Sequence, residues 1–240
     1  MRRVASNLII VLACVVASTA DAEDHAYQEI EVDSGGAIWG RIFFEDDYPE
    51  VKKRKVNIDA DTCGIRVASE QFVVDPDSRG LANAVLLIEE IEAGKPFATA
   101  EAAISQLKCR YDPHVIVMRS GESLSIKNED PVLHNVHAYQ GKSSLFNLAQ
   151  PSKGQLTERQ IKNAGVVRLK CDVHAWMSAY VVVVDSPYVT LSDENGGYSI
   201  GDVPPGEYSL TLWHEVLGRS TKTVTVRPGE KTRIDFPIGG

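Results

Sequence analysis

Short stretches in which apolar and polar residues alternate recur along the chain and are separated by turn residues. In residues 166–171 the apolar Val167, Leu169 and Cys171 alternate with Arg168 and Lys170. This period of two is typical of a strand with one buried face. Similar alternation occurs in residues 123–128, 208–212, 224–226 and 234–236. We therefore expect an all-β protein.

Continuous apolar runs add further strands. They are expected at residues 37–44, 55–58, 71–74, 84–88, 115–117 and 180–184. Residues 99–107 fit either a short helix or a strand. The polar, glycine-bearing residues 139–165 are expected to be connecting structure anchored by Phe146. Turn sequences at residues 193–197, 203–206 and 227–230 separate short strands, which is typical of a small β-sandwich.

The N-terminus has the features of an export signal. Arg2 and Arg3 precede an apolar stretch, and Ala20-Asp21-Ala22 forms a small-x-small cleavage site. We therefore expect residues 1–22 to be a signal peptide and the protein to be periplasmic or otherwise exported. Cys14 leaves a lipoprotein signal as an alternative. The apolar stretch is too short for a convincing membrane span, and no other segment is a candidate for one.

The charge of the chain argues against a nucleic-acid partner. The 240 residues carry a formal net charge of −8, which becomes one unit more negative once the signal peptide is removed. The largest basic cluster, residues 52–55, flanks a strand and is expected to be a solvated edge. The negative charge favours a basic or neutral docking partner.

Residues 171–177 hold a thiolate, an imidazole and a thioether as Cys171, His174 and Met177, spaced C-x2-H-x2-M. Their position between two expected strands places them on a tight loop where ligands can converge. Met is scarce, with three in the chain, so chance clustering is disfavoured. These side chains together suit a copper ion that changes oxidation state. The loop lacks a second histidine.

The exported chain contains three cysteines, and an oxidising compartment favours a bridge between two of them. If Cys171 binds metal, Cys63 and Cys109 remain to form the disulfide. In the chain-entropy model a bridge closing a loop of that size adds about 4 kcal/mol of stability.

Asn128-x-Asp130-x3-His134-Asn135, followed by C-x2-H-x2-M, resembles the copper-binding pattern of the cupredoxins. The short ligand loop is most similar to that of amicyanin, and the resemblance covers about residues 100–186. It implies a Greek-key β-sandwich with one type 1 copper ion held by His134, Cys171, His174 and Met177. It also implies that Asn135 ties the two ligand-bearing loops together by hydrogen bonds.

The same resemblance implies that His174 exposes an edge through which electrons leave. Val173 and Trp176 would form part of an apolar docking patch beside it, although Trp176 fits packing under the loop equally well. The remaining histidines are not expected to bind this copper. His137 would face the surface and His114 would be a core or edge residue, while His25 and His214 are distant in sequence.

Residues 187–240 resemble the carboxypeptidase regulatory-like, or transthyretin-like, β-sandwich through Thr190-x2-Asp193-x-Asn195-Gly196-x-Tyr198 and Pro205-Gly206-x-Tyr208. Residues 23–99 form an N-terminal β region that either belongs to this sandwich, with the cupredoxin inserted, or stands as a separate piece. The combined order is similar to exported proteins described as methylamine-utilisation-like, a label that indicates no substrate.

We expect the protein to carry single electrons between redox protein partners and not to be an enzyme. No nucleophile–base pair or phosphate-binding loop is visible in the sequence. A copper chaperone or scavenger is one alternative, but it would favour Met-rich or His-rich tracts. A structural or partner-binding β protein is another, and the four-ligand set argues against it.

Overall fold

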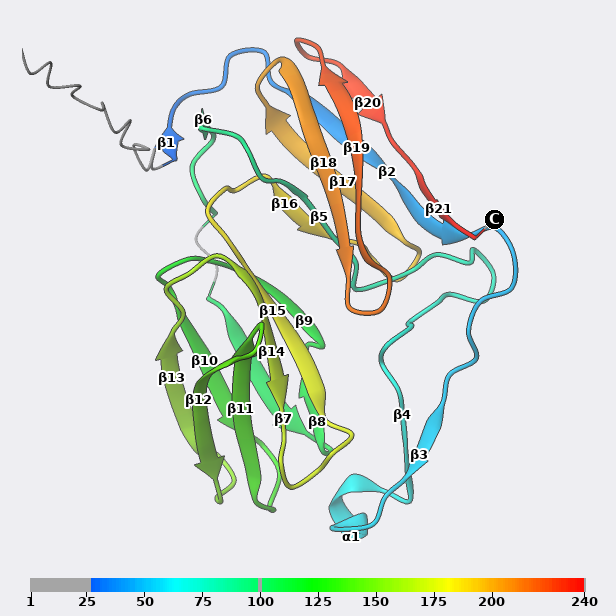
Figure 1. Cartoon of the computed structure of the whole chain (residues 1–240), viewed down its shortest axis with the longest axis vertical. Helices are drawn as coiled ribbons and strands as arrows, with labels where there is room; N and C mark the ends of the chain where they lie inside the picture. Colours follow the sequence, from blue (N-terminus) through cyan, green and yellow to red (C-terminus); the bar gives the residue numbers. More distant parts are fainter. Residues whose placement is uncertain (1–26, 99–100, 240) are drawn as a thin grey trace, which may run out of the picture.

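The computed structural model describes residues 27–98 and 101–239, and nearly every element in them is a strand (Figure 1). The only helix among these residues is α1 (Ala60–Cys63). The expected all-β class is confirmed. The expected signal peptide at residues 1–22, with Cys14, and also His25 lie outside the described residues. No helix in the described part of the chain has the length and apolar character needed to cross a membrane.

The first sandwich packs a sheet of order β13-β10-β7-β8 against a sheet of order β12-β11-β14-β15-β9. Its strands are β7 (Ala103–Leu107), β8 (Arg110–Asp112), β9 (Val115–Arg119), β10 (Ser123–Asn128), β11 (His134–Gln140), β12 (Ser143–Gln150), β13 (Leu156–Gln160), β14 (Gly165–Lys170) and β15 (Ser178–Val184). Along β14, Val167 and Leu169 are buried while Arg168 is exposed, as the alternation predicts.

The expectation that residues 139–165 only connect strands is wrong, because β12 and β13 lie there. Each lies at the edge of its sheet and is mostly exposed. Leu145 and Leu156 even point their apolar side chains to solvent. An edge strand with little burial carries no strong period-two pattern, so the sequence signal is weak.

The second sandwich is built from both ends of the chain. One sheet has the order β16-β5-β18-β19, and the other has the order β17-β2-β20 with β21 also paired to β2. Its strands are β2 (Gly36–Phe44), β5 (Val85–Ile88), β16 (Val189–Leu191), β17 (Gly197–Val203), β18 (Gly206–His214), β19 (Gly218–Val226), β20 (Lys231–Arg233) and β21 (Phe236–Ile238). The N-terminal strands β2 and β5 therefore lie between C-terminal strands, and the first sandwich is inserted between β5 and β16 in sequence. A short parallel pair, β1 (Gln28–Glu29) with β6 (Ala93–Gly94), lies beside it.

Between β2 and β5 the chain leaves the second sandwich, runs to the far end of the first, and returns (Figure 1). This excursion contains β3 (Lys53–Lys55), α1 and β4 (Arg66–Ala68), with β3 and β4 antiparallel. We call residues 51–69 the arm. Val56, Cys63 and Val67 of the arm are buried in the core of the first sandwich. The arm is thus packed onto that sandwich as part of its core.

The strands predicted in this region are misplaced. The strand expected at residues 55–58 is found at β3, and the strand expected at residues 71–74 reduces to an isolated bridge between Val74 and Leu81. Neither segment joins a sheet of three or more strands. An apolar run becomes a strand only where a neighbouring strand offers hydrogen-bonding partners, and local sequence does not report this.

The two sandwiches meet through packed and hydrogen-bonded side chains. His114, which precedes β9, donates from Nδ1 to the carbonyl of Ser178 at 3.1 Å. Its Nε2 contacts the Glu215 carboxylate, which follows β18 of the second sandwich. Both side chains are nearly inaccessible to solvent. The rings of Tyr180 and Trp213 also meet across the joint, with centroids 5.4 Å apart. His114 is therefore a buried residue of the joint between sandwiches.

Candidate metal centre

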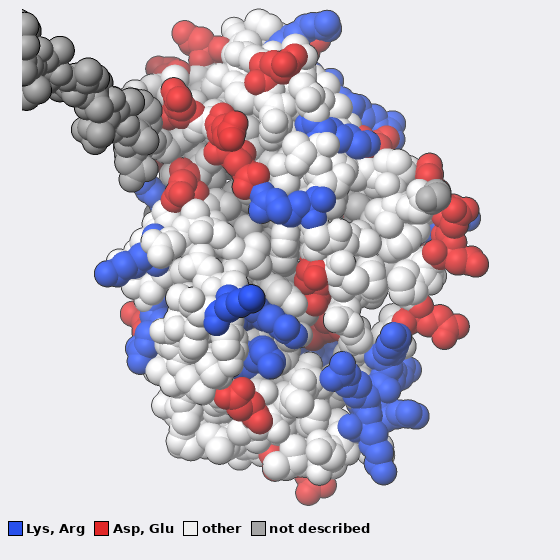
Figure 2. All heavy atoms as spheres, viewed as in Figure 1, with Lys and Arg blue, Asp and Glu red and all other residues white. Residues whose placement is uncertain are grey.

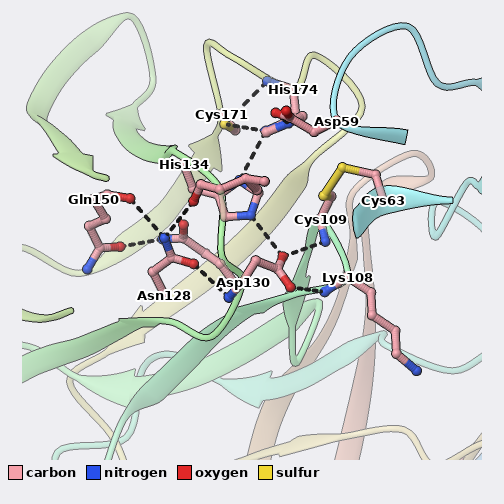
Figure 3. A network of polar contacts seen from close by, with 12 residues as sticks. Asp59, Cys63, Lys108, Cys109, Asn128, Asp130, His134, Gln150, Cys171 and His174 are labelled. Carbon is pink, nitrogen blue, oxygen red and sulfur yellow. Dashed lines mark hydrogen bonds and ion pairs between the residues drawn. A yellow bond between two sulfur atoms is a disulfide. The ribbon is translucent and has the colours of Figure 1, made fainter. Parts of the chain in front are cut away.

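The fold brings three of the four predicted ligands to one point. His134 begins β11, and Cys171 and His174 lie in the loop after β14 (Figure 3). The Nδ1 atoms of His134 and His174 are 3.0 Å apart, and Sγ of Cys171 is 3.7 Å from Nδ1 of His174. We call these three residues the ligand cluster. Each is at most 1% exposed, so the cluster is sealed from solvent.

The loop that carries two of these ligands is closed by its own hydrogen bonds. The backbone N–H of His174 donates to Sγ of Cys171 at 3.4 Å, and the N–H of Met177 donates to the carbonyl of His174 at 2.9 Å. Met177 is buried in the same core as Cys171. A thiolate that accepts a backbone hydrogen bond is held in one orientation, which pre-organises it for a metal.

The ring of His134 is oriented by a carboxylate on its far side. Nε2 of His134 contacts Oδ2 of Asp130 at 2.9 Å. Asp130 in turn accepts hydrogen bonds of 2.8 Å from the backbone N–H groups of Lys108 and Cys109. Those two residues form the tight β7–β8 turn with φ of 51° and 55°. Such left-handed backbone is unfavourable for Lys and Cys, and the carboxylate stabilises it by binding both N–H groups.

The Asn128 side chain holds the backbone of Asp130 in turn. Asn128 accepts from the backbone N–H of Asp130 at 2.9 Å and donates to the carbonyls of Val132 and Gln150 at 3.0 and 2.8 Å. Asn128 and Gln150 are both fully buried. The series of hydrogen bonds from Asn128 through Asp130 to His134 therefore fixes the His134 ring at Nε2, the nitrogen that faces away from the ligand cluster (Figure 3).

The ring of His174 has an equivalent partner that comes from the arm. Its Nε2 contacts Oδ2 of Asp59 at 3.0 Å, and the two residues are 115 apart in sequence. Asp59 precedes helix α1 but makes no capping hydrogen bond with its side chain, and its φ is 52°. An aspartate at this position normally caps the helix. Here the carboxylate is turned to the ligand ring instead.

The expectation that His174 exposes an edge to solvent is wrong. His174 is fully buried because Asp59, Trp176 and the disulfide surround its ring. The cupredoxin-like pattern contains no segment equivalent to the arm, so the pattern alone predicts an open site. Asp59, which covers the ring, lies 115 residues before His174, so no pattern local to the loop predicts the contact.

The disulfide joins Cys63 of the arm to Cys109 of the β7–β8 turn. Its sulfur atoms and a ring nitrogen of His174 lie within 4.8 Å of one another. Trp176 donates from Nε1 to the carbonyl of Cys109 at 3.1 Å, and its ring is 5.1 Å from that of His174. Trp176 therefore packs between the β7–β8 turn and the ring of His174. Cys171 is the free cysteine among the described residues.

Asn135 links the two ligand-bearing segments. Its Oδ1 accepts from the backbone N–H of Asp172, and its Nδ2 donates to Oδ2 of Asp172 at 3.1 Å and to Asn147 at 2.7 Å. His137 also contacts Asp172, at 3.0 Å, on the partly exposed face of β11. His137 therefore lies outside the ligand cluster and supports the loop from the other face.

The donor set fits a soft, first-row metal ion. Burial lowers the pKa of His134, although the Asp130 hydrogen bond opposes this, so the neutral ring is favoured. With Nε2–H groups directed at Asp130 and Asp59, both Nδ1 atoms present lone pairs, which repel at 3.0 Å unless a cation lies between them. Imidazole nitrogens bind zinc-like ions at about 2.0–2.1 Å, so one ion can reach both. Two imidazoles with a thiolate suit copper.

Asp59 and Asp130 are the functional residues that the sequence reasoning missed. Asp130 stands four residues before His134 and is part of the quoted pattern, so its role in orienting the ring was open to inference. Asp59 carries no such signal. Its only hint is its place four residues before a cysteine that bridges to the site.

Comparisons with known proteins give partial likenesses. The carboxypeptidase regulatory-like domain family matches residues 165–239. No curated protein matches the chain in sequence. A purple cupredoxin from Nitrosopumilus maritimus is similar in structure with a TM-score of 0.32 and 23% identity, over 35% of this chain and 99% of that one.

Two further solved structures give the same picture. A reduced amicyanin variant has a TM-score of 0.32 and 24% identity, over 42% of this chain and 98% of its own. A copper-containing nitrite reductase from Thermus scotoductus SA-01 has a TM-score of 0.32 and 17% identity, over 37% of this chain and 23% of its own. The chain thus combines a region matched by the carboxypeptidase regulatory-like family with a region weakly similar in structure to cupredoxins.

Proposed function

We propose that this protein is an exported type 1 copper protein that carries single electrons between redox proteins. His134, Cys171 and His174 would hold the ion through two ring nitrogens and a thiolate, and the thioether of Met177 would be the weakest of the four donors. When bound, copper supplies a one-electron redox couple. We infer no substrate chemistry, because an ion held by four side chains has no coordination position open for a substrate. We accordingly propose that the protein is not an enzyme.

One observation carries this proposal. Nδ1 of His134, Nδ1 of His174 and Sγ of Cys171 converge while a carboxylate holds the opposite nitrogen of each ring. Carboxylate–histidine pairs of this kind fix the tautomer and the ring orientation of metal-binding histidines. A site that is held in one geometry changes little between two oxidation states, which is what fast electron transfer needs.

Burial of the ligands argues against a copper chaperone or scavenger. Such a protein needs ligands that a partner can reach and exchange. His134, Cys171 and His174 are at most 1% exposed, and the arm is fixed over His174 by a disulfide and by core packing. A resident ion that exchanges electrons fits this arrangement better than a cargo ion.

Titration of the purified mature chain with Cu(II) tests the proposal. We expect one equivalent of copper to give an intense visible band from thiolate-to-copper charge transfer. Cys171→Ser should abolish the band, while Cys63→Ser/Cys109→Ser, which removes the neighbouring sulfurs, should keep it. A colourless complex, or colour that survives Cys171→Ser, would refute the proposed function.

A further inference from the structure

The arm is the most basic segment near the ligand cluster. Residues 51–69 contain five Lys and Arg side chains and two carboxylates, although the whole chain has a net charge of −8. The five cations are Lys52, Lys53, Arg54, Lys55 and Arg66, and all are exposed. Figure 2 shows blue side chains gathered where Figure 1 places β3 and β4.

These charges have no ion-pair partner in the described part of the chain. Among the residues that the structure describes, none of the five cations forms an ion pair, although other surface cations such as Lys127 and Arg219 do. Of the two carboxylates of the arm, that of Asp59 is turned to His174. The arm therefore presents its positive charge to solvent.

The arm also exposes two apolar side chains and borders a hollow. Ile65, at the tip between α1 and β4, is 77% exposed, and Ile58 is 43% exposed. Beside them an open groove of about 450 Å³ separates the arm from the β7–β8 hairpin. Arg66, Lys108 and Arg110 line it, and the carboxylates of Glu70 and Asp112 leave its lining with a positive balance. Apolar contacts surrounded by charge are typical of protein–protein interfaces.

The arm is held in place over the ligand cluster, so a partner that touches it comes close to the ligands. Val56, Cys63 and Val67 anchor it in the core, and the bridge to Cys109 fixes its middle. The Asp59 side chain is 32% exposed on one side and contacts the fully buried ring of His174 on the other. One side chain therefore separates the surface of the arm from the ligand.

We propose that the arm is the docking surface for an acidic redox protein, which exchanges single electrons, by way of Asp59 and His174, with the copper ion that the ligand cluster would hold. This inference rests on the proposed function and names the partner class for the same site. The net charge of the chain favours a basic or neutral partner, but association is steered by the local field around the contact surface, and here that field is positive.

Two variants with equal charge change test the proposal. Lys53→Glu/Lys55→Glu reverses two exposed cations of the arm. Lys142→Glu/Lys162→Glu reverses two exposed cations elsewhere on the first sandwich, one after β11 and one after β13, at the strand ends away from His134. The redox-inert, paramagnetic hexacyanochromate(III) anion is added to the metal-free chain, and broadening of backbone amide signals is mapped by NMR.

We expect broadening to centre on residues 52–67, to vanish in the arm variant and to persist in the matched control. In the copper-loaded chain the reduced site gives one electron to hexacyanoferrate(III), which becomes hexacyanoferrate(II), with no bond made or broken. At low salt that rate should fall about tenfold in the arm variant and stay within twofold in the control.

The docking proposal is overturned if broadening lies elsewhere, or if both variants change the rate equally while the visible band is intact. Failure of the proposed function has a different signature. In that case the copper complex lacks the thiolate band, while the NMR map of the metal-free chain still decides whether the arm binds an anionic probe.

Discussion

Nδ1 of His134 lies 3.0 Å from Nδ1 of His174, and each ring contacts an aspartate through Nε2. The two aspartates come from different parts of the chain, because Asp130 precedes β11 and Asp59 belongs to the arm. Two buried ring nitrogens that face each other at this distance are suited to bind one cation between them. The arm completes it by supplying the second aspartate.

Removal of the Asp59 carboxylate should loosen the metal site without unfolding the chain. Glycine accepts the φ of 52° at this position, so Asp59→Gly removes the side chain without adding backbone strain. We expect copper affinity to fall about 10–100-fold, the usual effect of losing the partner of a ligand histidine. Competition with a chelator of known affinity measures this.

Asp59→Asn separates charge from hydrogen bonding. The amide oxygen still accepts from Nε2–H, and Asn tolerates the left-handed backbone, so affinity should remain closer to wild type than in Asp59→Gly. Asp61→Asn, on the exposed side of α1, is the control and should change nothing. Equal affinities in Asp59→Gly and Asp61→Asn would show that the His174 contact has no role in binding.

Loss of the disulfide should destabilise the protein substantially. Cys63 and Cys109 are 46 residues apart in sequence, and the chain-entropy model gives about 4 kcal/mol for closing such a loop. Cys63→Ser/Cys109→Ser should lower the free energy of unfolding by up to that amount in urea denaturation. A thiol count on the unreduced, metal-free mature chain should find one free thiol. Three free thiols would contradict the bridge.

His214 predicts a pH dependence in the second sandwich. The ring stacks on Phe72, its Nδ1 accepts from the backbone N–H of Val216 at 3.3 Å, and burial lowers its pKa to about 4 despite the nearby Glu215 carboxylate. The unfolded chain takes up this proton below about pH 6.5. The free energy of unfolding therefore has its full value above pH 6.5. It decreases by on the order of 3 kcal/mol as the pH drops towards 4.

The variant His214→Asn isolates this contribution, because its side-chain oxygen keeps an acceptor near Val216 but does not titrate. Urea unfolding of both proteins between pH 7 and pH 4 makes the comparison. The free energy of unfolding of wild type should decrease more steeply than that of the variant. Parallel profiles would show that the His214 proton is not linked to folding.

The sequence indicates the ligand loop and the central strands for a physical reason. Val167, Leu169 and Cys171 alternate because β14 buries one face, and the spacing of Cys171, His174 and Met177 is set by a loop of fixed length. Such local constraints leave local patterns. The edge strands β12 and β13 bury little, so they leave almost none.

The segment that covers the candidate metal centre could not be predicted in the same way. Asp59 meets His174 only because the excursion between β2 and β5 folds back across the first sandwich. The sequence predicts that the basic residues 52–55 form a solvated strand edge, and these residues are exposed. Their proximity to the ligand cluster depends on long-range packing of Val56 and Val67, which no single stretch of sequence encodes.

The EPR spectrum of the mature chain with one equivalent of Cu(II) tests the central claim most directly. If Cys171 binds copper as a thiolate beside the two imidazoles, the unpaired electron spreads onto sulfur, and the copper hyperfine splitting narrows. We predict this narrow splitting for the wild-type chain. We also predict that Met177→Gln changes the axial character of the EPR spectrum but keeps the narrow splitting. The wide splitting of an ordinary tetragonal Cu(II) site in the wild-type chain would contradict the account.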